Sequence, residues 1–165
     1  NLIFSKKRAF TSAPRHIILF FIFMDFIKKN LLQLALIQVT LATIGSLVFS
    51  EILKFPPCIL CWYQRVAMYP LVVIFAIGIW KKDKNVPYFA LPLSLVGLAI
   101  AIYHNLLYYK ILPESTLPCT LGISCTTRYI EWFGFITIPF LSMAAFITTT
   151  LLILLHVKLN GRAGN

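Results

Sequence analysis

Residues 56–80 of the chain read PPCILCWYQRVAMYPLVVIFAIGIW: a double proline, a CxxC motif and then an almost wholly apolar run. A helix that crosses the hydrocarbon core of a bilayer needs about 20 predominantly apolar residues, and the run Trp62–Trp80 is long enough. Three further runs of similar length have the same character: Leu31–Ser50, Pro87–Tyr109 and Phe133–Val157. The sequence therefore predicts four membrane spans.

The composition agrees with a chain that lives in lipid. Of 165 residues, 59% are hydrophobic and 12% charged, and the mean hydropathy is +0.85, outside the range of soluble domains. The apolar runs are continuous rather than alternating with polar residues, which favours helices over the strands of a barrel. The connections are too short for a soluble domain. The expected fold is an all-α membrane protein, a four-transmembrane-helix bundle with residues 31–157 as one membrane domain.

The net charge of +10 sorts along the chain in a way that predicts orientation. Six Lys and Arg residues precede the first apolar run, three lie in residues 81–86, and two lie in the tail, residues 158–165. The other two connections, residues 51–61 and 110–132, carry equal numbers of basic and acidic side chains. By the positive-inside rule, both termini and the middle connection are expected in the cytoplasm. The charge then needs no nucleic acid partner.

Residues 1–30 form a basic N-terminal segment. Its apolar stretch Ile17–Ile27 is interrupted by Asp25 and is too short to span a bilayer. It has no small-residue cleavage site, which argues against a removed signal peptide. The first methionine is Met24, and the hypothesis is that Met24 is the natural start, with residues 1–23 upstream of it.

All four cysteines fall in the two connections predicted outside the cell: Cys58 and Cys61 before the second run, Cys119 and Cys125 between the third and fourth. An oxidising location favours disulfides, but four cysteines allow three pairings and the sequence does not choose among them. Cys58 and Cys61 have the spacing of a dithiol redox centre at a helix start, where free N–H groups favour a thiolate. Cys119 and Cys125 lie in a turn-forming loop that a protein partner can reach.

Two other functions fit four cysteines. One is a non-enzymatic membrane protein with a structural disulfide in each loop. The other is a metal-binding or transport protein, with a four-cysteine zinc site. The oxidising location disfavours zinc, and no acidic residue lies within any predicted span, which weakens the transport reading.

The run Pro57–Arg65 resembles the signature of the DsbB/BdbC disulfide-bond-formation family. Four spans, a CxxC motif entering the second and a cysteine pair between the third and fourth extend the resemblance over about residues 28–157. The close spacing of Cys119 and Cys125 is more similar to the BdbC branch. The vitamin K epoxide reductase family does related chemistry, but its CxxC lies late in the chain.

The resemblance implies a thiol–quinone oxidoreductase of the bacterial plasma membrane. An extracytoplasmic thioredoxin-like partner would attack the Cys119/Cys125 disulfide, with Cys119 as the sulfur attacked. Electrons would pass to Cys58/Cys61 and then to a membrane quinone, menaquinone or ubiquinone, with Cys61 facing it.

Two polar residues inside the predicted spans have alternative readings. Arg65 lies at i+4 from Cys61 and shares its helix face; the resemblance implies that it helps bind quinone, whereas the simpler reading is an arginine that snorkels to the interface. His104, near the outer end of the third span, is expected either to assist quinone protonation or to be a hydrogen-bonded packing residue. Aromatic residues near this boundary are expected to form an interfacial belt: Trp62, Tyr63, Tyr108, Tyr109 and Trp132.

Overall fold

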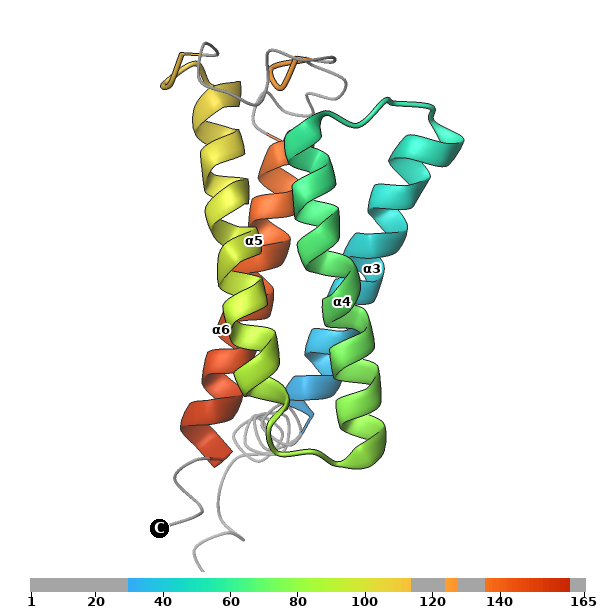
Figure 1. Cartoon of the computed structure of the whole chain (residues 1–165), viewed down its shortest axis with the longest axis vertical. Helices are drawn as coiled ribbons and strands as arrows, with labels where there is room; N and C mark the ends of the chain where they lie inside the picture. The colour runs from blue at the N-terminus through green and yellow to red at the C-terminus, as the bar shows by residue number, and fades with distance from the viewer. Residues whose placement is uncertain (1–29, 114–123, 128–135, 161–165) are drawn as a thin grey trace, which may run out of the picture. The chain divides into compact units, whose positions relative to one another are not determined.

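In the part of the chain that it describes, the computed structural model of the protein contains four helices long and apolar enough to cross a membrane (Figure 1). The structure describes residues 30–113, 124–127 and 136–160. The chain divides into two units, Asn1–Leu31 and Leu32–Asn165, and the second contains the membrane helices. Its helices are α3 (Leu31–Leu47), η1 (Val48–Ile52), α4 (Ile59–Lys81), α5 (Val86–Tyr108) and α6 (Ile138–Asn160). The predicted all-α, four-span fold is confirmed.

The connection between α3 and α4 ends one helix and starts the next. After α3 the chain makes one π-helical turn, η1, and then Lys54 adopts a left-handed φ of 55°. Pro56 and Pro57 cannot continue a helix, because each lacks an N–H and clashes with the preceding turn. Cys58 is then the extended N-cap of α4, with φ −69° and ψ 168°. The predicted helix start at the CxxC motif is confirmed.

Helix α6 begins at Ile138, whereas the apolar run was expected to span from Phe133. Thr137 caps the helix: its hydroxyl oxygen accepts the backbone N–H of Phe140 at 3.3 Å. Pro139 fits in the first turn, where its missing N–H needs no partner. Hydropathy alone does not locate this boundary, because the residues before the cap are as apolar as those after it. Residues 128–135 lie outside the described part of the chain.

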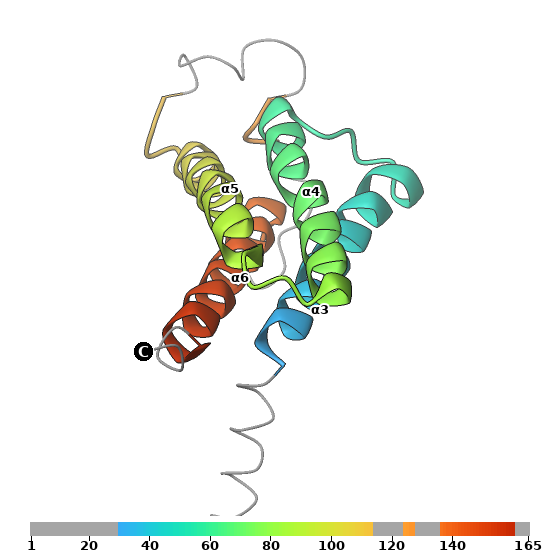
Figure 2. The ribbon, with the colours of Figure 1, turned by 60° about the horizontal axis from the view of Figure 1, so that its bottom comes forward.

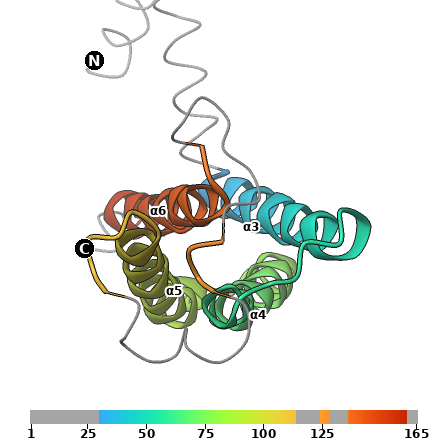
Figure 3. The same cartoon turned by 90° about the horizontal axis from the view of Figure 1, so that it is seen from above.

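Helix α5 packs against both α4 and α6, and their backbones approach closely. Gly97 of α5 makes one close approach possible, because a side chain there would collide with the ring of Phe146, which is fully buried in α6. Ser94 and Thr150 also hydrogen-bond across this interface, at 2.7 Å. Helix α3 approaches the other three less closely. Its C-terminal end diverges from α4 in the views of Figures 1 and 3.

The two ends of the bundle carry different residues. The connection from α4 to α5 and the C-terminal end of α6 lie at one end, as Figures 1 and 2 show. That end holds Lys81, Lys82, Lys84 and Lys158, whereas the start of α4, with its two cysteines, lies at the other end together with Lys54 and Lys110. The segregation of charge in the sequence thus matches the two ends of the fold. Which end faces the cytoplasm stays a prediction.

The lateral surface of the helices is apolar and exposed, as expected for a lipid-facing protein. Trp62 and Tyr63 are about half exposed near the cysteine end, and Trp80 and Tyr88 are more than 80% exposed near the other. This distribution is typical of interfacial aromatic belts. Tyr108 departs from the expectation, because it is only 4% exposed and faces the interior of the bundle.

Candidate redox site

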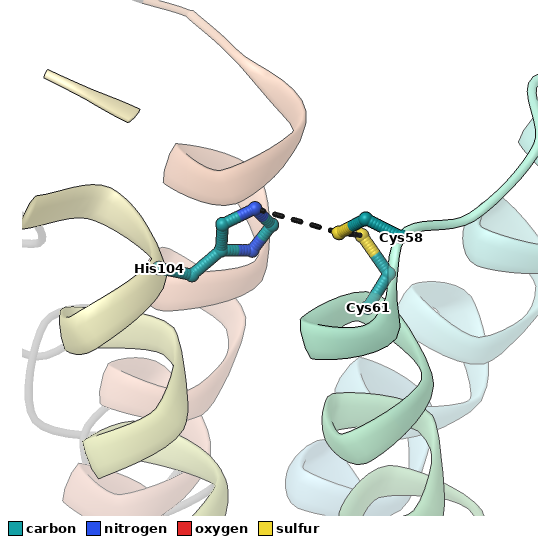
Figure 4. A group of neighbouring side chains, drawn as sticks. All are labelled: Cys58, Cys61 and His104. Carbon is teal, nitrogen blue, oxygen red and sulfur yellow. Dashed lines mark hydrogen bonds between the residues drawn. The ribbon is translucent and has the colours of Figure 1, made fainter. Parts of the chain in front are cut away.

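The CxxC motif forms a pair of free thiols at the start of α4 (Figure 4). The two sulfur atoms of Cys58 and Cys61 lie 3.1 Å apart, within hydrogen-bonding distance. Cys58 is nearly buried, while Cys61 is half-buried. The hydrogen bond from the Cys61 thiol, reinforced by His104, holds the pKa of Cys58 below its usual range despite burial. The arrangement therefore favours a thiolate at Cys58 in the reduced pair.

His104 of α5 lies beside this pair, at the level the sequence predicted. Its Nε2 atom is 3.7 Å from the Cys58 sulfur, the contact dashed in Figure 4. The same atom is 3.2 Å from the backbone carbonyl oxygen of Cys125. The ring is only 2% exposed, so these contacts are shielded from water. His104 thus connects the CxxC motif to the segment that carries the third described cysteine.

A second set of contacts holds the other side of the imidazole. The side-chain nitrogen of Gln64 lies 3.3 Å from His104 Nδ1, and the hydroxyl of Ser142 donates to the Gln64 side-chain oxygen at 2.9 Å. Gln64 is 6% exposed. Residues from α4, α5 and α6 therefore form one hydrogen-bonded chain that ends at the Cys58 sulfur.

Arg65 points into the protein rather than out to the interface, and is 8% exposed. Its Nε donates to the Ser46 hydroxyl at 2.9 Å, and its Nη2 donates to the Ser46 carbonyl oxygen at 2.8 Å. The guanidinium also lies 5.4 Å from the ring centroid of Trp62, within the range of a cation–π interaction. Arg65 therefore joins α4 to α3 one turn below the cysteines.

A cavity of about 440 Å³ adjoins the CxxC pair, Arg65 and His104. Cys61, Arg65 and His104 contribute to its wall, and most of the remaining lining is apolar. The lining includes Leu41 and Gly45 of α3, Phe49 of η1, and Leu141 and Phe146 of α6. A Cβ atom added at Gly45 would meet no other atom within 4 Å. The volume is within the range of small-molecule sites, roughly 300–1,000 Å³.

The second cysteine pair is only half described. Cys125 takes part in a disulfide bond and is 3% exposed. It belongs to a buried cluster with Cys58, Leu60 and Leu107. Cys119 lies outside the described residues, so its pairing with Cys125 stays a prediction.

Three of these side chains are placed to bind a metal ion. The ligand atoms of Cys58, Cys61 and His104 all lie within 4.8 Å of one another. Zinc uses thiolate and imidazole ligands at such distances, with three protein ligands in its open sites. The donor set differs from the four-cysteine site considered from the sequence, because a histidine joins the CxxC pair.

Sequence reasoning did not assign roles to Gln64, Ser142, Ser46 or Gly45. Gln64 carried a usable signal, since an uncharged polar side chain in a membrane span needs a partner. Serine and glycine occur throughout such helices, so nothing in the sequence distinguished these three. Their roles depend on which helices meet.

A bundle of membrane helices with a free dithiol at one end, next to a buried imidazole, defines a class of membrane thiol–disulfide oxidoreductases. The family described as "Disulfide bond formation protein DsbB" matches residues 28–156, and the chain belongs to this family. It is a multi-pass bacterial membrane protein whose family activity is disulfide formation.

Several relatives carry names of the same kind. The chain is 44% identical over 136 residues to "Probable disulfide formation protein C 2" of Bacillus anthracis, covering 82% of this chain and 94% of the relative. It is 51% identical over 108 residues to "Disulfide bond formation protein C" of Bacillus subtilis, covering 65% and 78%. No solved structure matches the chain. The predicted resemblance, including its closeness to the BdbC branch, is confirmed.

Proposed function

We propose that this protein oxidises an extracytoplasmic thioredoxin-like partner and passes the electrons to a membrane quinone, menaquinone or ubiquinone. The partner's two thiols lose two electrons and two protons as their disulfide forms. Those electrons reduce the Cys119/Cys125 disulfide, then the Cys58/Cys61 disulfide. A bound quinone accepts both electrons and both protons and becomes the quinol.

The cavity beside the CxxC pair is the observation that carries this proposal. It adjoins Cys61, its lining is mostly apolar, and Arg65, Gln64 and His104 are among the polar residues in its wall. Small-molecule sites combine an apolar lining with a few polar groups that orient the ligand. A quinone ring has this chemistry, with two carbonyl oxygens on a flat apolar body.

Arg65 is the proposed contact for a quinone oxygen. Its Nε and Nη2 are used by Ser46, whereas Nη1 has no hydrogen bond to any described residue. A guanidinium held on two sides presents its remaining N–H groups in a fixed direction. The proposed role of Arg65 is to orient the carbonyl while its charge stabilises developing negative charge nearby.

The burial of Cys125 supports different roles for Cys119 and Cys125 in the transfer. A partner's thiolate must reach the sulfur it attacks, and Cys125 is almost inaccessible. We therefore assign the attack by the partner to Cys119 and the contact with the CxxC pair to Cys125. In Cys125→Ser mixed with the oxidised partner, the Cys119 thiolate should attack the partner's disulfide, release one partner thiol and accumulate as a mixed disulfide, whereas Cys119→Ser should trap none.

The direct test is an anaerobic mixture of the purified protein, a quinone and a reduced thioredoxin-like protein, followed by quinone absorbance. Menaquinone and ubiquinone are compared in separate reactions. Stoichiometric formation of quinol and partner disulfide is expected. Oxidation of the partner without quinone reduction would show that quinone is not the electron acceptor.

Gly45 permits a test of the cavity itself. Gly45→Leu should fill part of the cavity and raise the KM for quinone, while a soluble chemical oxidant still reoxidises Cys58 and Cys61. Gly45→Ala is the matched control, because its Cβ meets no neighbour and leaves most of the volume. Unchanged quinone KM in a folded Gly45→Leu protein would place the quinone elsewhere.

The cluster of Cys58, Cys61 and His104 supports a second candidate, a zinc site in the reduced protein. Anaerobic purification followed by metal analysis distinguishes the two. One equivalent of zinc that is lost in His104→Gln would favour the metal site. Rapid reoxidation by quinone in metal-free protein would favour the redox role.

A further inference from the structure

The contacts of His104 determine which of its ring nitrogens carries the proton. Nδ1 faces the Gln64 amide nitrogen at 3.3 Å, and an amide nitrogen can only donate. Nε2 faces the Cys125 carbonyl oxygen at 3.2 Å, and a carbonyl oxygen can only accept. Both contacts require the same form of the ring, with Nδ1 bare and Nε2 protonated. The carbonyl contact is independent of how the Gln64 amide is oriented.

Ser142 holds the Gln64 amide beside His104. A hydroxyl can donate or accept, so this contact fits either orientation of the amide, and the Cys125 carbonyl oxygen selects the one observed because it requires the proton on Nε2: the Ser142 hydroxyl donates to the Gln64 oxygen at 2.9 Å and the amide nitrogen faces Nδ1. In the reversed orientation the amide oxygen would face Nδ1 and would favour a proton there. The chain from Ser142 through Gln64 to His104 therefore has a direction.

We propose that Gln64 is a positioning residue that, held by Ser142, keeps the proton of His104 on Nε2, facing the Cys58 sulfur and the Cys125 carbonyl oxygen. The inference rests on the proposed redox role of the Cys58/Cys61 pair and adds the device that orients its histidine.

This orientation matters when the Cys58–Cys61 disulfide is reduced. Two electrons enter, the S–S bond breaks, and the Cys58 sulfur gains negative charge. The Nε2–H group, 3.7 Å away, donates to that sulfur. With the proton on Nδ1, a lone pair would face both the sulfur and the carbonyl oxygen, and both contacts would become repulsive. Gln64 and Ser142 thus act on Cys58 through His104 without touching it.

The position of the proton on the His104 ring can be measured directly by NMR. The full chain is labelled with ¹⁵N-histidine, reduced anaerobically and placed in lipid nanodiscs, and ¹H–¹⁵N correlation spectra report which nitrogen of His104 is protonated. His104→Gln identifies the signals. The native protein should show Nε2–H. A proton on Nδ1 in the native protein would overturn the proposal.

Two substitutions at Gln64 should move the proton of His104 toward Nδ1 by different amounts. Gln64→Leu removes the donor and should produce a mixture of the two ring forms. Gln64→Glu places an acceptor against Nδ1 and should draw a proton to it. Ser142→Ala should act like Gln64→Leu with a smaller effect, because the amide stays but loses the hydrogen bond that holds it against His104.

Ser94→Ala is the matched control, since it also removes a buried hydroxyl from a hydrogen bond between α5 and α6. It should leave the spectrum of His104 unchanged. With Cys119 and Cys125 replaced by serine, the pH at which the alkylation rate of Cys58 in the reduced protein falls to half its plateau value should rise by roughly 0.4 to 1 unit in Gln64→Leu, the shift for the loss of one hydrogen bond. A native-like spectrum and a native-like alkylation profile in both Gln64 variants would overturn the proposal. Because neither readout uses quinone, failure to reduce quinone would leave this result intact.

Discussion

Cys58 should remain a thiolate over the working pH range of the reduced protein. The hydrogen bond from Cys61 lowers its pKa, with His104 adding to the effect. An ordinary cysteine, with a pKa near 8.5, reacts about tenfold faster with iodoacetamide for each pH unit up to that value. We expect the alkylation rate of Cys58, measured by mass spectrometry, to be nearly constant from about pH 6 to pH 9.

Two variants of Cys61 distinguish the effect of its hydrogen bond on the Cys58 pKa from the effect of the position of Cys58 at the start of α4. Cys61→Ala removes the donor and should restore a rising pH profile at Cys58, whereas Cys61→Ser keeps an O–H donor and should stay flatter. The lowered pKa of Cys58 also makes the stability of the reduced protein depend on pH. A folded pKa below the unfolded one stabilises the reduced protein above the unfolded pKa, and this stabilisation disappears as the pH falls through the folded value. Rates at native Cys58 that climb through the whole range would contradict the lowered pKa.

Arg65→Ala should weaken the apparent quinone affinity. A charge-assisted hydrogen bond contributes about 1.5–3 kcal/mol, or roughly 10- to 100-fold. The measurement is the quinone KM, with reoxidation of the cysteines by a chemical oxidant as the reference. Arg65→Lys should recover only part of the loss, because it lacks the planar fork.

Ser46→Ala tests whether Arg65 affects quinone binding only by linking α4 to α3 through Ser46. It removes the hydroxyl contact but keeps the guanidinium and its bond to the Ser46 carbonyl oxygen. If quinone binding depends on the charge, Ser46→Ala should change KM much less than Arg65→Ala. Equal effects of the two substitutions would assign Arg65 a structural role.

Among the helices, the α5–α6 contact is the one most sensitive to added volume. Gly97→Ala places a methyl group where the Phe146 ring lies, so the ring or the helices must shift. Overpacking of this kind costs about 1–3 kcal/mol. The expected result is a lower midpoint in unfolding by SDS titration.

Gly45→Ala is the comparison, because the same substitution on α3 meets open space and improves helix propensity. It should leave the midpoint unchanged or raise it. Phe146→Leu combined with Gly97→Ala should restore part of the lost stability, since the two residues share one space. A Gly97→Ala protein as stable as the native one would contradict the close packing.

The elements were predictable to different degrees. Hydropathy located all four helices, and Pro56 and Pro57 located the start of α4 before Cys58. The start of α6 was not predictable from the apolar run, because it depends on the Thr137 cap. Arg65 and His104 were recognised as polar residues in apolar spans. Their actual partners Ser46 and Gln64 were not, because those contacts join residues 19 and 40 positions apart.

For the molecule as a whole, orientation in the membrane is the property to test. The segregated charges predict that the cysteine end faces outward. An impermeant maleimide added to intact cells after mild reduction should label Cys119, and labelling should not require lysis.

The opposite end supplies the control. Lys84→Cys, in a protein whose native cysteines are replaced by serine, should be labelled only after the cells are opened. Lys84 is exposed in the connection between α4 and α5, so access within the protein does not limit the reaction. The reverse pattern at the two positions would invert the topology and move the redox chemistry to the cytoplasmic face.

The cavity is lined by residues of all four long helices and reaches the segment of Cys125, while Gly45 and Arg65 line it from α3 and α4. On the proposed route, the two half-reactions can therefore be stopped separately. A compound lodged against Gly45 and Arg65 would leave the oxidised protein able to discharge its stored disulfides once. The kinetic signature of such an inhibitor is a stoichiometric burst of partner oxidation followed by arrest, and adding more partner would not relieve it.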